Sequence, residues 1–413
     1  MIVRSDVAHD ARVVREAEAL RDDGHAVRII GKDVPEDWAR PDGIVVDSVG
    51  ARSAFGRSAP RGRPLPPHLA AARWALLPRH NASVWASFLA AAEHRADELA
   101  ASSAHGSSEP GAAPESAFDV VHAHDFPVLP LATRLARRHG ARLVYDAHEW
   151  WSGRLRAGRP TPVADARERR VERELAARAD AVLTVSPGIV ERFAEAGVPG
   201  VHLVRNTFPA RAHGPVGSPP SGVVYAGRLG PGRDLETVLA AAHRVPALPL
   251  TLVGPADQGW LGALEHAGRR DEGVGGAGGA EGGLPPGARV LPHVAPDDVD
   301  ALLQQAGVSL VTLEDSCENH RLALPNKLFQ AARAGVPVVA ADLPEIRRLV
   351  QGHDLGVLYR PGDVGSLVDA LTQVRARHAE LVAAVAAAAP SLTWAADAER
   401  LRSVYRGLSG AAG

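Results

Sequence analysis

The segment Leu324-Pro-Asn-Lys-Leu-Phe-Gln330 leads into Ala334-Gly-Val-Pro-Val-Val-Ala340, and together they predict a helix followed closely by a strand. Pro325 lies near the first turn of the predicted helix, where the missing N–H of proline costs little. The β-branched run that follows has the composition of a buried strand. A helix joined this closely to a strand is half of a βα repeat, so the segment predicts a parallel α/β sheet.

The same alternation of short apolar runs and amphipathic stretches extends along nearly the whole chain. We expect strands at 1–4, 26–30, 44–49, 120–124, 143–146, 181–185 and 201–204, and again at 223–226, 250–253, 289–291, 308–312, 336–340 and 356–358. Helices are expected between them, at 11–23, 128–139, 167–179, 188–196, 235–244, 297–305, 326–334 and 364–377. The pattern predicts two Rossmann-like, doubly wound parallel-sheet domains in one chain.

Two domains also suit the length of 413 residues. The break falls in the stretch Pro209-Ala-Arg-Ala-His-Gly-Pro-Val-Gly-Ser-Pro-Pro220, whose prolines and glycines interrupt any periodicity. We therefore expect a first domain at 1–209, a second at 210–390 and a C-terminal helical segment at 391–413, whose return to the first domain is left open. The small-residue stretches 102–116 and 268–287 are expected to be flexible insertions.

The composition excludes several classes of protein. Lys and Arg number 46 against 48 Asp and Glu, which argues against nucleic acid as the main partner because its binding depends on neutralised phosphates. The single cysteine, Cys317, excludes a disulfide framework. No run has the length of a signal peptide or a membrane span, so we expect a cytoplasmic protein. The first predicted strand is short, which leaves a start upstream of Met1 open.

The stretch 68–101 reads as a pair of helices that pack on the first sheet, with Trp74, Trp85 and Phe88 on their apolar sides. The alternative is an element that faces a membrane surface or an acceptor, with Trp and Arg at an interface. This alternative leaves peripheral contact with the inner face of a membrane open.

A glycine-rich loop follows the strand at 223–226 and reads Gly227-Arg-Leu-Gly-Pro-Gly-Arg-Asp234. Glycines after a parallel strand let backbone amides approach an anion, and a helix begins at about Asp234. Arg228 and Arg233 would then hold a diphosphate with paired donors. The alternative is a tight turn that carries two surface arginines.

A second candidate anion site lies at Asn326 and Lys327, in the first turn of the predicted helix 326–334. A lysine at the positive end of a helix dipole is unfavourable unless an anion lies beside it. The alternative is that Asn326 only caps the helix and Lys327 points to water.

Polar residues collect at the ends of two strands in the first half of the chain. His122, His124 and Asp125 end one strand, and Asp146, His148 and Glu149 end the next. We expect a polar acceptor site there, in which His148 exchanges a proton with a hydroxyl or stabilises a developing cation. A metal site from His122, His124 and His148 is an alternative, but the spacing matches no recognised ligand pattern. Asp10 is expected to cap the first helix.

The order and spacing of these motifs resemble those of retaining GT-B glycosyltransferases of the family 4 type. The resemblance rests on Asp10-Ala-Arg12-Val13 with Glu18 to His25, Asp119 to Asp125, Asp146-Ala-His148-Glu149, Ala179 to Ser186, Gly227-Arg228-Leu229, Leu252-Val-Gly254, the opening segment and Asp342-Leu-Pro-Glu-Ile.

The resemblance implies a nucleotide-sugar donor, UDP- or GDP-linked, bound by the second domain, and a hydroxyl acceptor bound by the first. The acceptor would be a glycan, a glycolipid or a small metabolite. Transfer would retain the anomeric configuration, with no resident cofactor or metal. The implied donor-binding residues are Gly227, Arg228, Arg233, Asn326, Lys327 and Gln330, and His148, Arg228 and Lys327 would act in catalysis. The implied acceptor-side residues are Asp10, Arg12, His124, Asp125 and Glu149.

One departure concerns two glutamates that family members commonly place eight positions apart. Here the positions hold Leu322 and Gln330. Gln330 keeps a carbonyl acceptor for ribose hydroxyls but lacks the charge, so Gln330→Glu is expected to keep or strengthen donor binding. Glu318 or Glu345 would be the nearby compensating acid. The departure leaves two alternatives open: a catalytically silent nucleotide-sugar-binding or partner protein of GT-B fold, and a sugar-nucleotide epimerase.

Overall fold

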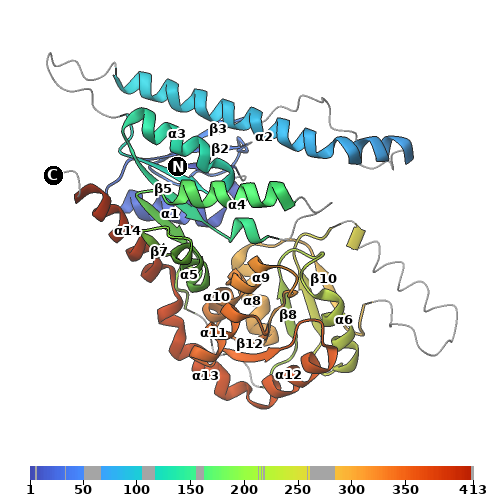
Figure 1. Cartoon of the computed structure of the whole chain (residues 1–413). Coiled ribbons are helices and arrows are strands. Elements are labelled where there is room, and N and C mark those ends of the chain that lie inside the picture. The colour runs from blue at the N-terminus through green and yellow to red at the C-terminus, as the bar shows by residue number, and fades with distance from the viewer. Residues whose placement is uncertain are drawn as a thin grey trace.

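The computed structural model describes residues 1–4, 7–32, 34–50, 67–104, 117–154, 162–212, 214, 216, 219–257, 259–260 and 284–410. These residues form two α/β domains, each built around one parallel sheet (Figure 1). The insertions expected at 102–116 and 268–287 lie largely outside the described residues, at 105–116 and 268–283.

The sheet of the first domain has seven strands in the order β3-β2-β1-β4-β5-β6-β7. They are β1 (Ile2–Val3), β2 (Val27–Lys32), β3 (Ile44–Val49), β4 (Val120–His124), β5 (Arg142–Ala147), β6 (Ala181–Thr184) and β7 (Val201–Leu203). Every neighbouring pair is parallel. The order reverses between β1 and β4, which is where ligands collect in open parallel sheets.

The second sheet has six parallel strands in the order β10-β9-β8-β11-β12-β13. They are β8 (Val223–Ala226), β9 (Leu250–Val253), β10 (Arg289–Leu291), β11 (Ser309–Val311), β12 (Val338–Ala341) and β13 (Gly356–Tyr359). Each strand expected from the sequence is present, with ends that differ by no more than a few residues. The prediction of two parallel α/β sheets is confirmed.

Helices cover both sheets. In the first domain they are α1 (Ala11–Asp22), α2 (Pro67–Ala104), α3 (Leu129–His139), α4 (Pro162–Ala176) and α5 (Pro187–Glu195), with short 3-10 turns η1 (Val7–His9), η2 (Phe126–Val128) and η3 (Trp151–Gly153). In the second they are α6 (Leu235–Arg244), α8 (Pro296–Ala306), α9 (Glu318–Leu322), α10 (Asn326–Ala334), α11 (Pro344–His353), α12 (Val364–Ala376) and α13 (His378–Ala388), followed by the turn η4 (Ala389–Leu392) and by α14 (Trp394–Gly410). Asp10 caps α1 as predicted, since its side chain accepts a hydrogen bond from the Val13 amide.

The prediction of a helix pair at 68–101 is wrong, because α2 is one continuous helix of 38 residues. Its second half packs on the first domain, where Phe88, Ala92 and Ala96 are buried in the core. The Trp85 indole also donates a hydrogen bond to the carbonyl of Pro127. The side chains of 67–82, including Trp74, lie outside the described residues.

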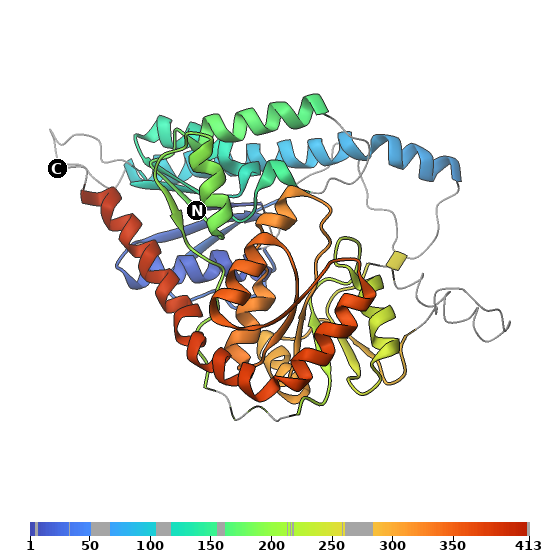
Figure 2. The ribbon, with the colours of Figure 1, turned by 60° about the horizontal axis from the view of Figure 1, so that its bottom comes forward.

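The last helix, α14, follows the second domain in the chain but packs against α1 and β7 of the first (Figures 1 and 2, dark red). Leu401 and Tyr405 are buried in the core beside α1. The Asp397 carboxylate accepts hydrogen bonds from Arg205 and Thr207, at the end of β7. The described part of the chain contains no helix that could span a membrane.

Candidate functional site

The two domains meet where strands of both sheets end. The Ser186 hydroxyl, after β6, donates to the carbonyl of Leu322 at 2.6 Å. Beside it, the Asn319 side chain of α9 accepts from the Trp150 amide at 2.9 Å and donates to Glu149 at 3.0 Å. The carboxyl ends of both sheets therefore face one another, so a ligand at this edge lies between the domains.

Two glycines shape the loops at the carboxyl ends of strands β8 and β9 in the second sheet. Gly227 has a φ of +149° and Gly254 a φ of +139°, a conformation that side-chain-bearing residues rarely adopt. A Cβ on Gly254 would lie 2.2 Å from the carbonyl oxygen of Gly227, and one on Gly227 would lie 2.9 Å from Lys327 Nζ. Only glycine lets the two loops and the lysine come this close.

Lys327 is the cation at the centre of this edge. Lys327 lies in the first turn of α10, and its Nζ is 4.5 Å from the centre of the Tyr225 ring. Burial and the nearby charge of Arg233 lower the pKa of Lys327 to about 7. An ammonium that has lost hydration beside a second cation and a helix N-terminus is poised to receive an anion.

The predicted diphosphate arginines differ in position. Arg233 lies close enough to Lys327 to depress its pKa. Arg228 is 63% exposed, and its guanidinium forms a paired interaction with Asp257 at 2.9 and 3.0 Å. Asn326 is the first residue of α10 and is exposed, so Pro325 and not Asn326 is the N-cap. Lys327 and Arg233 thus lie within electrostatic reach of one another, while Arg228 is held by a carboxylate.

A cavity of about 160 Å³ opens beside Gly227 and Gly254, next to Lys327. Its lining includes Phe208 of the interdomain linker, Gly227, Gly254, His293 and Gln330. Gln330 is 9% exposed, and its amide nitrogen donates to the carbonyl of Pro296 at 3.2 Å and to Asp300 at 3.3 Å. Asp257, Asp300 and Phe208 contact the predicted residues or line this cavity, and the sequence did not single them out, since each lies in a loop or helix that looks ordinary in isolation.

The glutamates considered as compensating acids are engaged elsewhere. Glu318 pairs with Arg192 at 2.7 Å and accepts from the Trp150 indole at 3.2 Å. Glu345 is buried beside Gly188 at the start of α5, where burial raises its pKa and a hydrogen bond from the Gly188 amide opposes this. Both carboxylates hold the domain interface, so neither faces the cavity that Gln330 lines.

On the first domain, His148 lies among carboxylates. Its Nε2 is 2.8 Å from Asp146 and its Nδ1 is 3.6 Å from Asp125. Burial alone would lower the pKa of His148, but these two carboxylates outweigh burial and raise it to about 10. The imidazole is therefore protonated at neutral pH and suits hydrogen-bond donation, whereas the expected exchange of a proton with a hydroxyl loses support.

Arg12 and His124 lie deeper than expected for residues that touch an acceptor. Arg12 is 1% exposed; it binds Asp146 through two hydrogen bonds and donates to the carbonyl of Val204 at 2.8 Å. His124 is 1% exposed and also contacts Asp146, at 3.2 Å. Both residues hold the carboxylate that orients His148, so the structure places them behind the site. Asp125 and Glu149 are half-buried at its surface.

A buried acidic and histidine cluster lies behind His148. Glu16, His122, His124 and Asp146 each offer one ligand atom within 4.8 Å of the others. Arg12 already pairs with Glu16 at 2.9 Å and with Asp146 at 2.7 Å, and protonated His148 adds a second cation. A divalent ion would raise the buried positive charge further, so these residues fit a charge network better than a metal.

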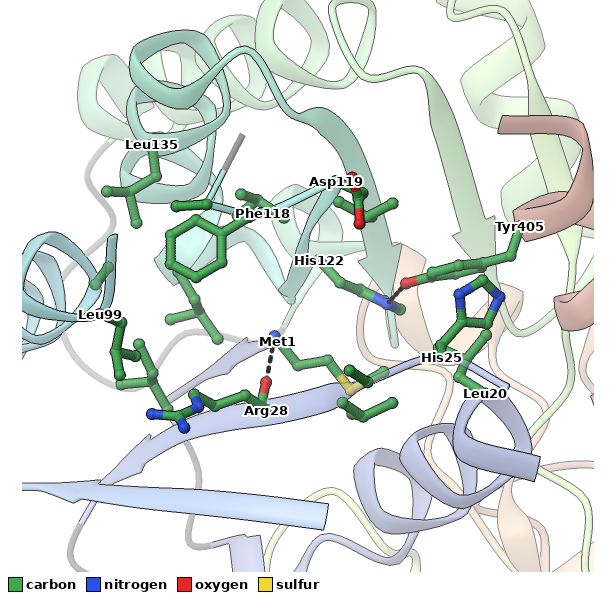
Figure 3. A pocket seen from close by; sticks show the side chains of 18 residues that line it. Met1, Leu20, His25, Arg28, Leu99, Phe118, Asp119, His122, Leu135 and Tyr405 are labelled. Carbon is green, nitrogen blue, oxygen red and sulfur yellow. Dashed lines mark hydrogen bonds between the residues drawn. The ribbon is translucent and has the colours of Figure 1, made fainter. Parts of the chain in front are cut away.

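A second cavity, of about 260 Å³, lies at the opposite edge of the first sheet (Figure 3). It adjoins the first residues of β2 and β4, beside Phe118 and Leu135. The Met1 amine donates to the carbonyl of Arg28 at 2.7 Å, and burial lowers its pKa to about 5. On the other side His122 meets the Tyr405 hydroxyl at 2.8 Å. This cavity lies mainly at the amino ends of the strands, and His122, which stacks on His124 at the end of β4, connects it to the cluster behind His148.

Comparison with protein families matches both halves of the chain. Residues 9–207 match the glycosyl transferase 4-like domain, and residues 220–376 match the glycosyl transferases group 1. Glycogen synthase of Mycobacterium tuberculosis is 26% identical over 271 residues, which cover 62% of this chain and 60% of that protein. The chain therefore aligns with only three fifths of the curated relative's length.

Solved structures share the fold over nearly the whole chain at low identity. Sucrose-phosphate synthase from Thermosynechococcus elongatus has a TM-score of 0.67 and 17% identity, covering 97% of this chain and 93% of that one. Anabaena HepE in complex with UDP has a TM-score of 0.64 and 15% identity, covering 98% of both chains. HepE in complex with UDP-glucose has a TM-score of 0.62 and 16% identity, covering 99% and 97%.

Proposed function

We propose, since this chain belongs to the group 1 glycosyltransferases and has the GT-B fold, that it transfers a sugar from a UDP- or GDP-linked donor to a hydroxyl acceptor. The second domain, 210–390, would bind the donor and the first, 1–209, the acceptor. The observation that carries the donor assignment is Lys327, an ammonium of lowered pKa in the first turn of α10 against Gly227.

The donor would lie across the edge of the second sheet. Lys327 and Arg233 would receive the diphosphate, and the cavity lined by Phe208, His293 and Gln330 would receive the nucleoside. Arg228 would exchange its bond to Asp257 for a phosphate oxygen when the donor binds, because a guanidinium binds either group through paired hydrogen bonds. That HepE is solved with UDP and with UDP-glucose supports this donor class.

We propose that transfer retains the anomeric configuration and needs no bound metal. Lys327, Arg233 and the first turn of α10 would stabilise the charge that develops on the leaving diphosphate. The diphosphate oxygen would take the proton of the acceptor hydroxyl, since His148 is already protonated. His148 would then orient a donor or acceptor oxygen as a hydrogen-bond donor. The acceptor would be a glycan, a glycolipid or a small metabolite, and Asp125 and Glu149 would line its side.

A release assay for UDP and GDP tests the proposal, with a panel of sugar nucleotides and with and without hydroxyl acceptors. We expect acceptor-dependent release of one of the two nucleotides, and a product whose anomeric configuration, read by NMR, equals that of the donor. Lys327→Ala is expected to abolish release in a folded protein. Donor binding without turnover, over a broad acceptor panel, would favour the silent-binder alternative instead.

A further inference from the structure

The proposed donor site does not explain why the Gln330 side chain, which lines the cavity, is hydrogen-bonded to two acceptors on α8. The amide nitrogen of Gln330 has two hydrogens, and both have acceptors on α8: the Pro296 carbonyl at 3.2 Å and Asp300 at 3.3 Å. Because both neighbours are acceptors, the amide nitrogen and not the oxygen must face them. The carbonyl oxygen is then the atom that Gln330 can offer to a ligand in the cavity that it lines.

Asp300 is itself fixed in place. It is 2% exposed, and its other carboxylate oxygen lies 2.7 Å from Arg333 and 3.6 Å from Arg211. Arg333 also lies over the ring of Phe208, 4.9 Å from its centre, and Phe208 is another wall of the same cavity. The oxygen that faces the arginines has no hydrogen bond of good geometry to any described residue, so the attraction of the two charges orients Asp300 and leaves its other oxygen for the Gln330 amide.

We propose that Asp300 is a positioning residue for the donor: it orients the Gln330 amide so that the cavity meets an acceptor for a ribose hydroxyl. The inference rests on the proposed nucleotide site and adds a residue that acts on the ligand only through Gln330. It also accounts for glutamine at this position, because a glutamate would place two carboxylates about 3.3 Å apart.

The pairing reverses the expectation from the sequence that Gln330→Glu keeps or strengthens donor binding. Beside Asp300 the new carboxylate would be repelled or protonated, and UDP affinity is expected to fall by about tenfold. Asp300→Asn alone has a different effect. Its amide oxygen would face Arg333 and its amide nitrogen Gln330, which favours a turned-over Gln330 amide that presents N–H groups to the cavity. The turn costs Gln330 its hydrogen bond to the Pro296 carbonyl, which keeps the Arg333 donor at 3.4 Å.

The two substitutions together restore the donor–acceptor pair between positions 300 and 330. In the double variant Gln330→Glu/Asp300→Asn, the introduced amide donates to the introduced carboxylate, whose other oxygen again faces the ribose. The Pro296 carbonyl loses its donor at position 330 and keeps Arg333 at 3.4 Å. Binding is measured by calorimetry with UDP, 2′-deoxy-UDP and 3′-deoxy-UDP, and with the guanosine equivalents. We expect the wild-type protein to prefer the ribose form by about tenfold, Asp300→Asn to lose that preference, and the double variant to regain it.

Asp297→Asn is the matched control. Asp297 lies on the same helix and contacts the same two arginines, at 2.9 Å and 3.5 Å, but it is 67% exposed and does not contact Gln330. It is expected to leave the ribose preference unchanged. Melting temperatures of all variants separate loss of fold from loss of preference, because a ratio measured on folded protein does not depend on stability.

The outcomes distinguish this inference from the function beneath it. A wild-type protein that binds neither UDP nor GDP would overturn the nucleotide site and the inference with it. A protein that binds one of them, but whose ribose preference survives Asp300→Asn or fails to return in the double variant, would overturn the role of Asp300 alone.

Discussion

Single residues decide the charge of this site, and Lys327 is the clearest case. The sequence places a lysine at the positive end of a helix, where it is unfavourable without an anion. The structure places Gly227 and the Tyr225 ring against the ammonium, and burial together with the charge of Arg233 lowers its pKa. Only the tertiary contacts turn an unfavourable position into a group that titrates near pH 7.

The pKa of Lys327, about 7, predicts that UDP affinity depends on pH. A bound diphosphate favours the charged ammonium and raises its pKa, so binding takes up a proton when the free lysine is neutral. Affinity is expected to fall as the pH rises from 7 to 9, by up to about tenfold per unit. Calorimetry over this range measures the slope.

Lys327→Gln is the control for this pH dependence, since glutamine is similar in length to lysine and does not titrate. Its UDP affinity is expected to be lower and nearly flat between pH 7 and 9. Parallel slopes in the wild-type protein and the variant would show that another group causes the pH dependence.

Arg12 tests whether a predicted acceptor-side residue is instead part of the interior. Arg12→Met leaves the Asp146 carboxylate buried without its main partner, and it is expected to lower the free energy of unfolding by about 3–5 kcal/mol. Urea unfolding measures the change. Arg21→Ala, on the same helix, removes exposed contacts with Asp22 and the Asp42 carbonyl and should cost far less stability. Equal stabilities of the two variants would contradict the interior role.

At the scale of elements, α10 and α9 show opposite degrees of predictability. The bounds of α10, Asn326–Ala334, agree with the expectation from the sequence, because an apolar face and a glycine after the last turn act locally. The helix α9 was not expected. It has five residues, no side-chain cap and no buried residue, so no sequence signal for a helix marks it. It packs on α11 of its own domain and on η3 and α5 of the first domain, and these contacts hold it.

The bridge made by Asn319 of α9 predicts an effect on catalysis. Asn319→Ala removes two hydrogen bonds across the domain interface, to Glu149 and to the Trp150 amide. Because the bridge holds the two domains in the arrangement seen here, kcat/KM is expected to fall by about thirtyfold, since each bond contributes about 1 kcal/mol. Steady-state kinetics with the identified donor and acceptor measure it.

The control for this bridge lies on the same short helix. Arg321→Ala removes an exposed pair with Asp315 inside the second domain and leaves the interface intact. Its kcat/KM should stay close to that of the wild-type protein. A loss as large as that of Asn319→Ala would assign the effect to α9 itself and not to the bridge.

At the scale of the whole molecule, the site depends on both domains at once. The anion site belongs to α10 and the loop after β8, while His148 and Glu149 follow β5. The linker residue Phe208 lies between Arg15 of α1 and Arg333 of α10, and its carbonyl accepts from the Trp394 amide at the start of α14. The chain passes between the domains twice, at the linker and at the start of α14, and these two segments meet beside the proposed nucleoside cavity.

The cations gathered at this interface predict transfer without a metal. In the proposed mechanism Lys327, Arg233 and the α10 N-terminus would supply the positive charge that a divalent ion would otherwise provide. Turnover is expected to persist at full rate after dialysis against EDTA and in its presence. The rate with and without added Mg²⁺ or Mn²⁺ measures this, and a loss of activity restored only by one of these ions would contradict the mechanism.

The sequence by itself determined the two parallel sheets, the glycine-rich loop, the lysine at a helix N-terminus and the family to which these motifs point. Those features depend on periodicity, turn residues and helix ends, which act over a few neighbouring residues. The sequence did not show that Arg12 and His124, predicted on the acceptor side, are buried, and it wrongly divided α2 into two helices.

Only the tertiary structure decided which charges meet. The pairs Arg228 with Asp257, Gln330 with Asp300 and Glu149 with Asn319 join residues that lie 29, 30 and 170 positions apart. Electrostatic and hydrogen-bonding energies depend on distances of a few ångströms and on burial, and neither is encoded in local sequence patterns. For that reason the fold could be predicted from the sequence. The protonation of His148, the lowered pKa of Lys327 and the amide atom that Gln330 presents to the cavity could not.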